Sequence, residues 1–163
     1  VDAPDLVTIQ LSDNQIGFHF GSVEITSRTI DGTYPNYKQV IPESTKTSVI
    51  INKAEFQKAV KTVSLFSKTG MFDIHLNINE QEQALELSAK DMARGENAVS
   101  LKAMVEGGEN AISLNYRYLL DGINAIQTDK IVLKMTDGAS PCLLLPFESE
   151  GEKFKYIVMP IRQ

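Results

Sequence analysis

The sequence has little cysteine, no long apolar run and no excess of basic residues. Cys142 is the only cysteine among 163 residues, so no disulfide can form within the chain, which fits a reducing cytoplasm. No apolar stretch approaches the roughly 20 residues of a membrane-spanning helix, and no signal-peptide pattern opens the chain. We therefore expect a cytoplasmic protein with no membrane partner. Because the chain begins at Val1 rather than Met, we expect its natural start to lie upstream.

The charge balance argues against a protein that reads base sequence in a DNA groove. The formal net charge is −5, whereas such proteins carry a clear basic excess. Any contact with DNA would come from a local basic face on an acidic body. Hydrophobic residues make up 42% of the chain, which is enough to build a core. The length suits one domain, or one domain plus a piece.

The motifs of common enzymes and metal sites are missing as well. There is no P-loop, G-x-G-x-x-G, H-E-x-x-H or C-x-x-C. His19 and His75 occupy polar positions of predicted strands, and no converging ligand accompanies either of them. We find no nucleophile with an adjacent base, and Cys142 lies in an apolar run typical of a core. We expect no catalytic residue, metal or cofactor, although an enzyme whose catalytic residues lie upstream stays open as an alternative.

An internal repeat is the strongest signal that is present. Residues 72–78 alternate between apolar and polar side chains, as a half-buried strand does. A polar turn follows at 79–83, and further strands are expected near 85–87 and 99–103. The same unit recurs at 131–135, 142–145 and 156–161, and again at 7–11, 16–20 and 23–25.

Two of the three units are preceded by a strand and a helix. Strands are predicted at 48–52 and 111–115, followed by helices to about residues 67 and 127. Asn52 and Asn115 are suitable N-caps for them. The chain thus reads as three strands and then two β-α-β-β-β units, an α+β pattern. The Pro-containing segment 33–43 is the natural linker, so we predict half a domain before it and a complete domain after it.

The two predicted helices each have an apolar and a polar face at 100° per residue. The core faces are expected to carry Phe56, Ala59, Val60 and Val63 in the first helix and Leu119, Ile123 and Ile126 in the second. Leu65 projects from the polar side, where it is either an incidental exposed leucine or a subunit contact. Lys58 and Lys61 are either a solvated face or contacts to DNA phosphates. Arg117 faces away from the core and can pair with Asp121, four residues on.

Three segments carry a resemblance to a known family. They are Ile25–Tyr37 with its run Asp-Gly-Thr-Tyr-Pro-Asn-Tyr, Asn115–Asp121, and the C-terminal Tyr156–Arg162. In order and spacing they resemble the bacterial DNA polymerase III beta subunit, the DNA sliding clamp, and the likeness covers the whole chain. It implies the clamp fold, with two β-α-β-β-β repeats per domain, antiparallel sheets outside and helices facing a DNA channel. Residues 1–37 would be the back half of the middle domain, and 38–163 the last domain.

The resemblance also implies the function and the partners. The family's subunits dimerise head to tail into a ring that encircles duplex DNA without sequence preference and acts as a processivity factor. Lys58, Lys61 and Arg117 would face the DNA channel, and Leu65 and Phe66 would form the dimer interface. DNA polymerase, the clamp loader and repair proteins would bind through a short linear motif in a peptide pocket. The pocket positions are Pro35, Gln39, Val40, Asn115, Tyr118, Ala139, Pro141, Ile157, Val158, Met159, Pro160, Ile161 and Arg162.

The last strand is open to two interpretations. It either packs into the core or lines the pocket, and we expect Val158 in the core with Ile157 and Met159 facing the pocket. On this strand alone, an unrelated α+β peptide-binding adaptor is the runner-up. The chain departs from the family at Gln39, where many clamps carry Arg, and at Pro141, where a small hydroxyl residue is common. Residues 91–97 also lack a dense acidic run, which puts the charge pairing of the ring interface in doubt.

Overall fold

The computed structural model describes residues 6–147 and 154–161. The chain divides into two compact units, and the boundary in the sequence lies between Asn36 and Tyr37. Arg162 of the predicted pocket lies outside the described residues. No helix in the described part of the chain is long and apolar enough to cross a membrane.

The first unit is a small antiparallel sheet. Its strands are β1 (Thr8–Leu11), β2 (Gln15–Phe20) and β3 (Val23–Arg28), in that order across the sheet. None of residues 6–36 is buried, and large apolar side chains such as Ile9, Leu11 and Ile25 stand exposed. A lone three-stranded sheet without a covered face lacks the burial that stabilises such sheets.

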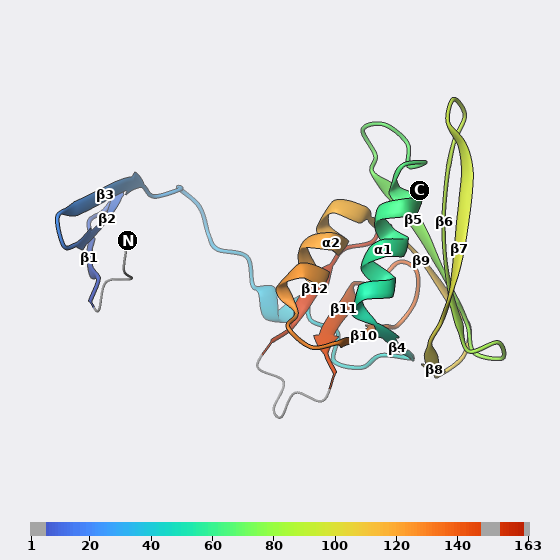
Figure 1. Ribbon diagram of the computed structural model, residues 1–163. Helices are drawn as coiled ribbons and strands as arrows, with labels where there is room; N and C mark the ends of the chain where they lie inside the picture. The colour runs from blue at the N-terminus through green and yellow to red at the C-terminus, as the bar shows by residue number, and fades with distance from the viewer. Residues whose placement is uncertain (1–5, 148–153, 162–163) are drawn as a thin grey trace. The chain divides into compact units, whose positions relative to one another are not determined.

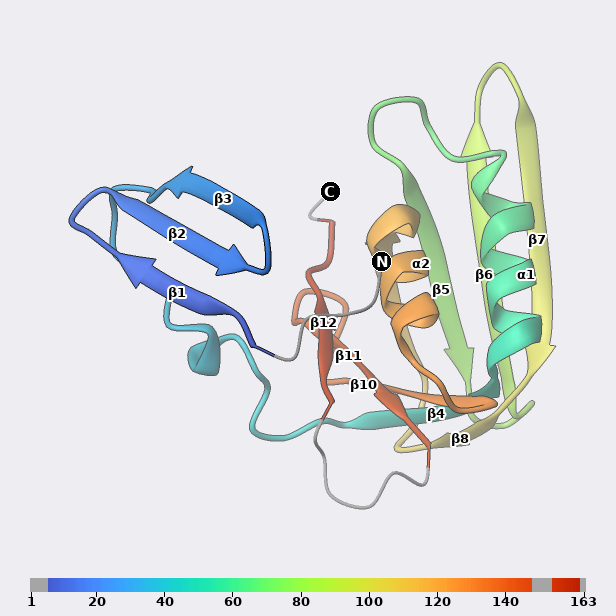
Figure 2. The same ribbon diagram turned by 60° about the vertical axis from the view of Figure 1, so that its left-hand side comes forward.

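The described part of the second unit contains two antiparallel sheets and two helices (Figures 1 and 2). One sheet has the order β7-β6-β5-β9 and the other β12-β11-β10-β4-β8. After a short 3-10 turn (Tyr37–Gln39), the elements are β4 (Thr47–Asn52), α1 (Lys53–Ser64), β5 (Asp73–Asn79), β6 (Ala84–Asp91), β7 (Gly95–Lys102), β8 (Met104–Glu106), β9 (Asn110–Asn115), α2 (Tyr116–Ala125), β10 (Lys130–Met135), β11 (Cys142–Pro146) and β12 (Tyr156–Val158).

The predicted repeat is present, and the two copies exchange their first strands. β4 precedes α1 but pairs with β10 of the second copy, while β9 precedes α2 but pairs with β5 of the first. Each sheet therefore contains strands from both copies. The helices pack side by side and cover the inner faces of both sheets (Figure 1).

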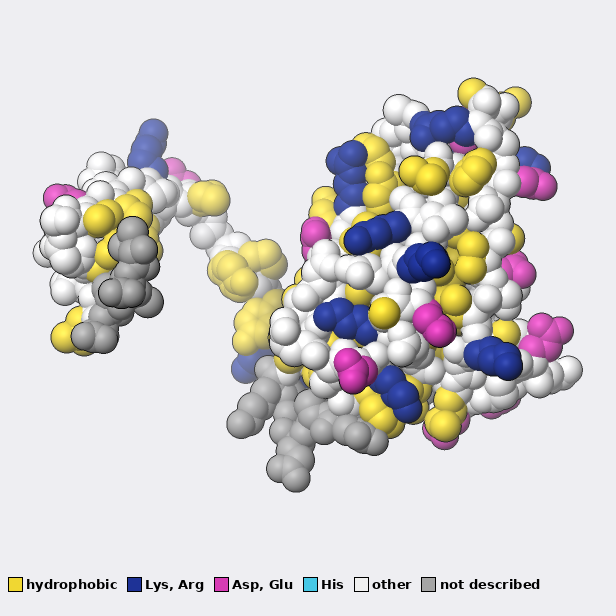
Figure 3. All heavy atoms as spheres, in the orientation of Figure 1, with side chains coloured by type: hydrophobic (Ala, Val, Ile, Leu, Met, Phe, Trp, Pro, Cys, Tyr) yellow, Lys and Arg dark blue, Asp and Glu magenta, His cyan; other side chains and the backbone are white. Residues whose placement is uncertain are grey.

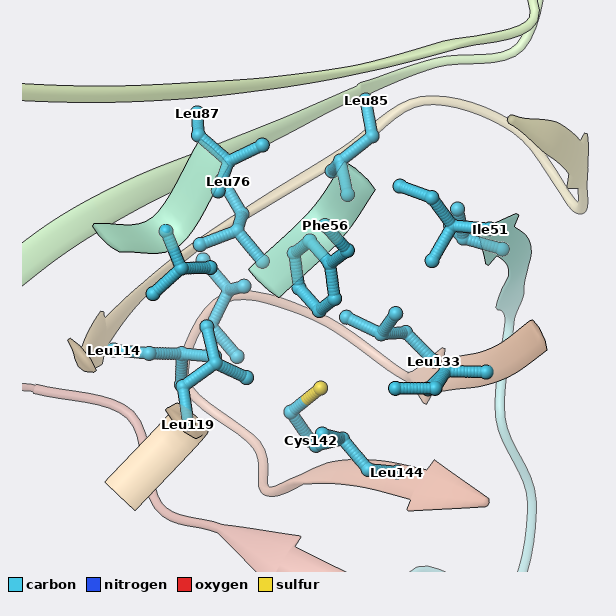
Figure 4. Packing of buried hydrophobic residues seen from close by; sticks show 14 of the residues in the cluster. Ile51, Phe56, Leu76, Leu85, Leu87, Leu114, Leu119, Leu133, Cys142 and Leu144 are labelled. Carbon is cyan, nitrogen blue, oxygen red and sulfur yellow. The ribbon is translucent and has the colours of Figure 1, made fainter. Parts of the chain in front are cut away.

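The core lies between the helices and the sheets (Figure 4). The apolar faces predicted for both helices are buried, from Phe56 and Val60 in α1 to Leu119 and Ile123 in α2. Cys142 is also fully buried, as its apolar surroundings in the sequence suggested. A core this continuous comes from apolar residues at helical and strand spacing, so the periodicity predicted it well.

Both predicted N-caps form. The side chain of Asn52 accepts a hydrogen bond from the N–H of Glu55 at 3.1 Å, and that of Asn115 accepts one from the N–H of Arg117 at 3.0 Å. The helices end slightly earlier than predicted, at Ser64 and Ala125. Residues 65–67 continue α1 only as tighter turns, in which each N–H bonds to the carbonyl three residues back.

The strand predictions are wrong in three details. The strand expected over 99–103 stops at Lys102, because the N–H of Ala103 bonds to the carbonyl of Gln83 and the chain turns into the short β8. The last strand stops at Val158, and Pro160 instead bridges Leu114 of the other sheet. Proline has no N–H for a strand ladder, which favours this ending.

The third error is the phase at the start of β5. Phe72 was expected on the apolar side of the strand, but it precedes the strand with a φ of 56°. Asp73 was expected on the polar side and is 3% exposed. Its carboxylate accepts a hydrogen bond from the N–H of Lys68 at 3.2 Å, so it is buried with a partner and holds the preceding loop.

Candidate functional site

A hollow of about 440 Å³ opens where α2 begins, beside the C-terminal segment. Its walls come from the start of α2, from β12 with the residues after it, and from the loop before β5. The lining residues are Met71, Asn115, Tyr118, Tyr156, Ile157, Val158, Met159 and Ile161. Six of the thirteen predicted pocket positions therefore come together in one place within the second unit.

The pairing of β12 with β11 determines which side chains of the C-terminal segment face the core and which face the hollow. Val158 pairs with Cys142 and is 2% exposed, so it belongs to the core as predicted. Met159 follows the strand and is 55% exposed, while Ile157 is half-buried. The N–H of Ile161 bonds to the carbonyl of Ser113 at 2.8 Å, which fastens the segment to β9. The segment that forms the apolar side of the hollow is thus held by β11 at its start and by β9 at its end.

Two lining residues were absent from the predicted set. Tyr156 packs against α2 at Gly122, and burial raises its pKa, helped by the charge of Asp121 and by Tyr118. Tyr156 could have been predicted as a lining residue because it begins the C-terminal segment that carries most of the predicted pocket positions. Met71 lies in the loop between α1 and β5. No periodic pattern extends to such a loop position, so no signal pointed to Met71.

The remaining predicted positions that the structure describes are not among the residues that line this hollow. Gln39 ends the 3-10 turn and Val40 follows it, with both side chains exposed. Ala139 lies in a turn where the carboxylate of Asp137 accepts the N–H groups of Ala139 and Ser140 at 2.9 and 2.8 Å. Hydrogen bonds from the Ser140 side chain and from these backbone groups lower the pKa of Asp137. Pro141 ends that turn, Pro160 bridges β9, and Pro35 belongs to the first unit.

The comparisons with known proteins identify the family. Residues 38–162 match the family described as DNA polymerase III beta subunit, C-terminal domain. This chain belongs to the DNA polymerase III beta subunit family. Its predicted membership and its predicted clamp fold are both confirmed. The alternative of an adaptor unrelated to this family is thereby removed.

Relatives of the beta subunit match nearly the whole chain. The beta sliding clamp of Synechocystis sp. is 30% identical over 160 residues, which are 97% of this chain and 40% of that protein. The clamp of Bacillus subtilis is 27% identical over 162 residues, 99% of this chain and 42% of that protein. The chain thus spans about two fifths of the length of the curated relatives it matches.

Solved structures give the same result. A Bartonella birtlesii clamp bound to griselimycin has a TM-score of 0.85 and 32% identity, covering 96% of this chain and 41% of that one. A Pseudomonas aeruginosa clamp crystallised with a ligand has a TM-score of 0.85 and 25% identity, covering 96% and 42%. At these values the arrangement of the strands and helices is that of the beta subunit.

The helix-bearing face of this beta-subunit chain carries Lys and Arg side chains (Figure 3). Lys58 and Lys61 are exposed on α1, as predicted from the helix spacing. Arg117 does not form the ion pair with Asp121 that the spacing allowed. Its guanidinium carbon lies 3.6 Å from the centroid of the Phe72 ring instead. Phe72 in turn meets Tyr116 edge to face at 5.9 Å.

Leu65 and Phe66 have different environments at the end of α1. Leu65 is 65% exposed, whereas Phe66 is partly buried against the core. The hairpin between β6 and β7 reaches this point, because Arg94 donates to the carbonyl of Leu65 at 3.1 Å and to the hydroxyl of Thr69. Near the same hairpin, Lys90 and Glu96 pair at 2.8 Å.

In the part of the chain that the structure describes, no group of three or more His, Cys, Asp or Glu side chains could hold a metal ion. Nδ1 of His75 lies 2.7 Å from the Ser113 hydroxyl, and Nε2 of His75 lies 3.9 Å from the carboxylate of Asp73. His75 and Ser113 are cross-strand partners on β5 and β9. The hydrogen bond between the His75 ring and the Ser113 hydroxyl links these two strands, and the carboxylate of Asp73 also accepts the N–H of Lys68.

Proposed function

We propose that this chain is the C-terminal part of a sliding clamp, a processivity factor that encircles duplex DNA and tethers the replicative polymerase. The hollow beside α2 is the observation that carries this proposal, because it combines an apolar lining with polar groups at its rim. We propose that polymerase, clamp loader and repair proteins insert a short linear motif there. The clamps of Pseudomonas aeruginosa and Bartonella birtlesii bound to griselimycin support a ligand site in this family.

The chemistry of the hollow suits such a motif. Met159, Ile157 and Ile161 offer apolar surface to leucine or phenylalanine side chains, and methionine adapts to differing partners. The Asn115 side-chain oxygen is engaged by the helix N-terminus, which leaves its NH₂ group to donate to a peptide carbonyl. Tyr118, 60% exposed, extends the rim.

Other predicted pocket positions complete the site in this proposal. Pro35, Gln39, Val40, Ala139, Pro141, Pro160 and Arg162 would extend it beyond the hollow. Gln39 is uncharged, so a peptide carboxylate would find less support there than in clamps that carry Arg at this position.

The DNA-facing surface in this proposal is the helix-bearing face. Lys58, Lys61 and Arg117 would contact phosphates only, because base readout would stall a sliding ring. Their contribution would fall as the salt concentration rises. The surface at Leu65 and Phe66 would close a homodimeric ring in the full-length protein.

We further propose that residues 1–37 are the back half of a middle domain and 38–163 the whole last domain. The exposed apolar sheet of the first unit supports this, because an upstream strand and helix would cover it. The chain would carry no catalytic residue and work in the cytoplasm, where the buried thiol of Cys142 stays reduced.

Fluorescence anisotropy tests the pocket. A labelled Gln-Leu-Ser-Leu-Phe peptide is titrated onto the full-length protein, onto a Met159→Ala variant and onto a Lys58→Ala control. We expect saturable binding that Met159→Ala weakens about tenfold, as truncation of a central anchor does, and that Lys58→Ala leaves unchanged. An absence of binding to protein shown by circular dichroism to be folded would overturn the pocket proposal.

A further inference from the structure

Arg117 is not among the residues that line the hollow, but it adjoins them both in the sequence and through its aromatic contact. In sequence it stands between Asn115 and Tyr118, both of which line the hollow. In space its guanidinium lies 3.6 Å from the ring centroid of Phe72, and Phe72 directly follows the lining residue Met71. The ring under the guanidinium therefore directly follows a lining residue, and Arg117 forms no ion pair with Asp121, the acid one turn further along α2.

The aromatic support is itself fixed in place. Phe72 adopts a left-handed backbone conformation, with φ of 56°, at the end of the loop before β5. Its carbonyl accepts a hydrogen bond from the N–H of Tyr116 at 2.9 Å, and its ring meets that of Tyr116 edge to face. Asp73, the next residue, is buried and pairs with Asn115 across β5 and β9. The position of the Phe72 ring is thus fixed by contacts with Tyr116, the first residue of α2, which is the helix that carries Arg117.

The charge of Arg117 has no acidic partner among the described residues. The ion pairs of the described chain involve His19, His75, Lys90 and Arg94. A guanidinium that contacts an aromatic ring through its carbon can still donate its N–H groups in its own plane. Those groups match the two oxygens of a carboxylate, which they bind bidentately.

We propose that Arg117 is a specificity-determining residue of the hollow, which selects peptides that carry a carboxylate next to their apolar anchors. The cation–π contact with Phe72 positions the guanidinium, and the apolar lining holds the anchors. This inference rests on the proposed peptide-binding function and deepens it. It also moves Arg117 from the DNA-facing set, where the family resemblance had placed it, to the peptide site.

The test compares matched peptides rather than absolute affinities. Starting from Gln-Leu-Ser-Leu-Phe, Asp is placed in turn at the first position, at the third position and at one added residue on each end, each with an Asn-containing twin. Anisotropy gives the ratio of Asn-peptide to Asp-peptide dissociation constants for the full-length protein. We expect at least one position with a preference for Asp of about tenfold, the size of one charged hydrogen-bonded contact.

Variants assign that preference. Arg117→Gln should abolish it, so that each Asp-containing peptide and its Asn-containing twin bind equally, because glutamine lacks the charged fork that binds a carboxylate. Arg117→Lys should keep part of it, since lysine retains the charge without the planar fork. Phe72→Leu should reduce it by loosening the guanidinium, and Lys58→Gln should leave it unchanged.

The outcomes separate this inference from the proposed function. Binding of the unmodified peptide with no Asp preference at any position would overturn the role of Arg117 and leave the pocket intact. A preference that survives Arg117→Gln would equally overturn it, as would an Arg117→Gln variant that weakens only binding to duplex DNA. No binding of any peptide would remove the pocket itself.

Discussion

Gly122 of α2 lies directly against the ring of Tyr156. A Cβ added at Gly122 would come within 2.5 Å of Cδ1 and 2.7 Å of Cε1 of that ring. Both residues are close to the hollow, which Tyr156 lines. The helix therefore needs a glycine at this point for the hollow to keep its shape.

Gly122→Ala should destabilise the protein even though alanine is the better helix former. Helix propensity would favour alanine by about 1 kcal/mol, but the clash with a partly buried ring should cost about 1–3 kcal/mol. Displacement of Tyr156 should also weaken the motif peptide several-fold. Chemical denaturation and anisotropy of the same variant measure the two effects, and an unchanged peptide affinity would show that Tyr156 is not needed in the wall.

The contrast between Leu65 and Phe66 yields a matched pair of variants. Leu65→Ala should change the free energy of unfolding by less than about 0.5 kcal/mol, because surface substitutions rarely do more. Phe66→Ala should cost more, because its ring packs against the core. If Leu65 closes the ring, Leu65→Ala should nonetheless raise the dimer dissociation constant of the full-length protein, which analytical ultracentrifugation measures. An unchanged dissociation constant would make Leu65 an incidental exposed leucine.

The two capping asparagines differ in function although they share a structural role. Asn52→Ala and Asn115→Ala should each cost about 1 kcal/mol of stability through the lost N-cap bond. Only Asn115→Ala should also weaken peptide binding, because Asn115 lines the hollow and Asn52 does not. Equal peptide affinities of the two variants would argue against a direct role for the Asn115 amide.

Cys142 should be inert in the folded protein. Burial raises the pKa of its thiol to about 12, so the reactive thiolate is absent at neutral pH. A thiol reagent at pH 8 should label Cys142 only after unfolding. Rapid labelling of the native protein would contradict the assignment.

The buried thiol of Cys142 should also make stability depend on pH. Because the folded pKa exceeds the unfolded one, this group's contribution to stability is complete below about pH 8.5 and is lost as pH rises toward 12. Cys142→Ser should cost about 1–3 kcal/mol, since it buries a more polar hydroxyl whose recorded acceptor, the Leu143 carbonyl, lies 3.9 Å from the present sulfur.

Hydrophobic periodicity in the sequence predicted the buried faces of the helices, and asparagines before the helical patterns predicted the helix caps. Phe56 and Val60 share one helix face because apolar residues recur every three to four positions, and Asn52 and Asn115 cap their helices because both stand before helical patterns. The sequence predicted the pairing of strands within the sheets less well. β8 forms because Gln83 bonds to both the N–H and the carbonyl of Val105, a long-range contact that no local pattern encodes.

The site was predictable only in part for the same physical reason. Asn115, Met159 and Ile161 were found through a resemblance of short segments, and Val158 through strand alternation. Met71 was missed because a loop position has no period. The contact between Arg117 and Phe72 was missed because it joins residues 45 positions apart, and the nearby Asp121 offered a simpler partner at helical spacing.

Topological linkage to DNA is the most direct test of the clamp proposal. The full-length protein is loaded with its clamp loader onto a nicked circular plasmid, and the bound fraction is isolated by gel filtration before and after one restriction enzyme linearises the DNA. A sliding ring should stay on the circle at high salt and leave once the plasmid has ends. Protein that dissociates from the circle at high salt, or that stays bound to the linear form, would contradict a ring that encircles DNA.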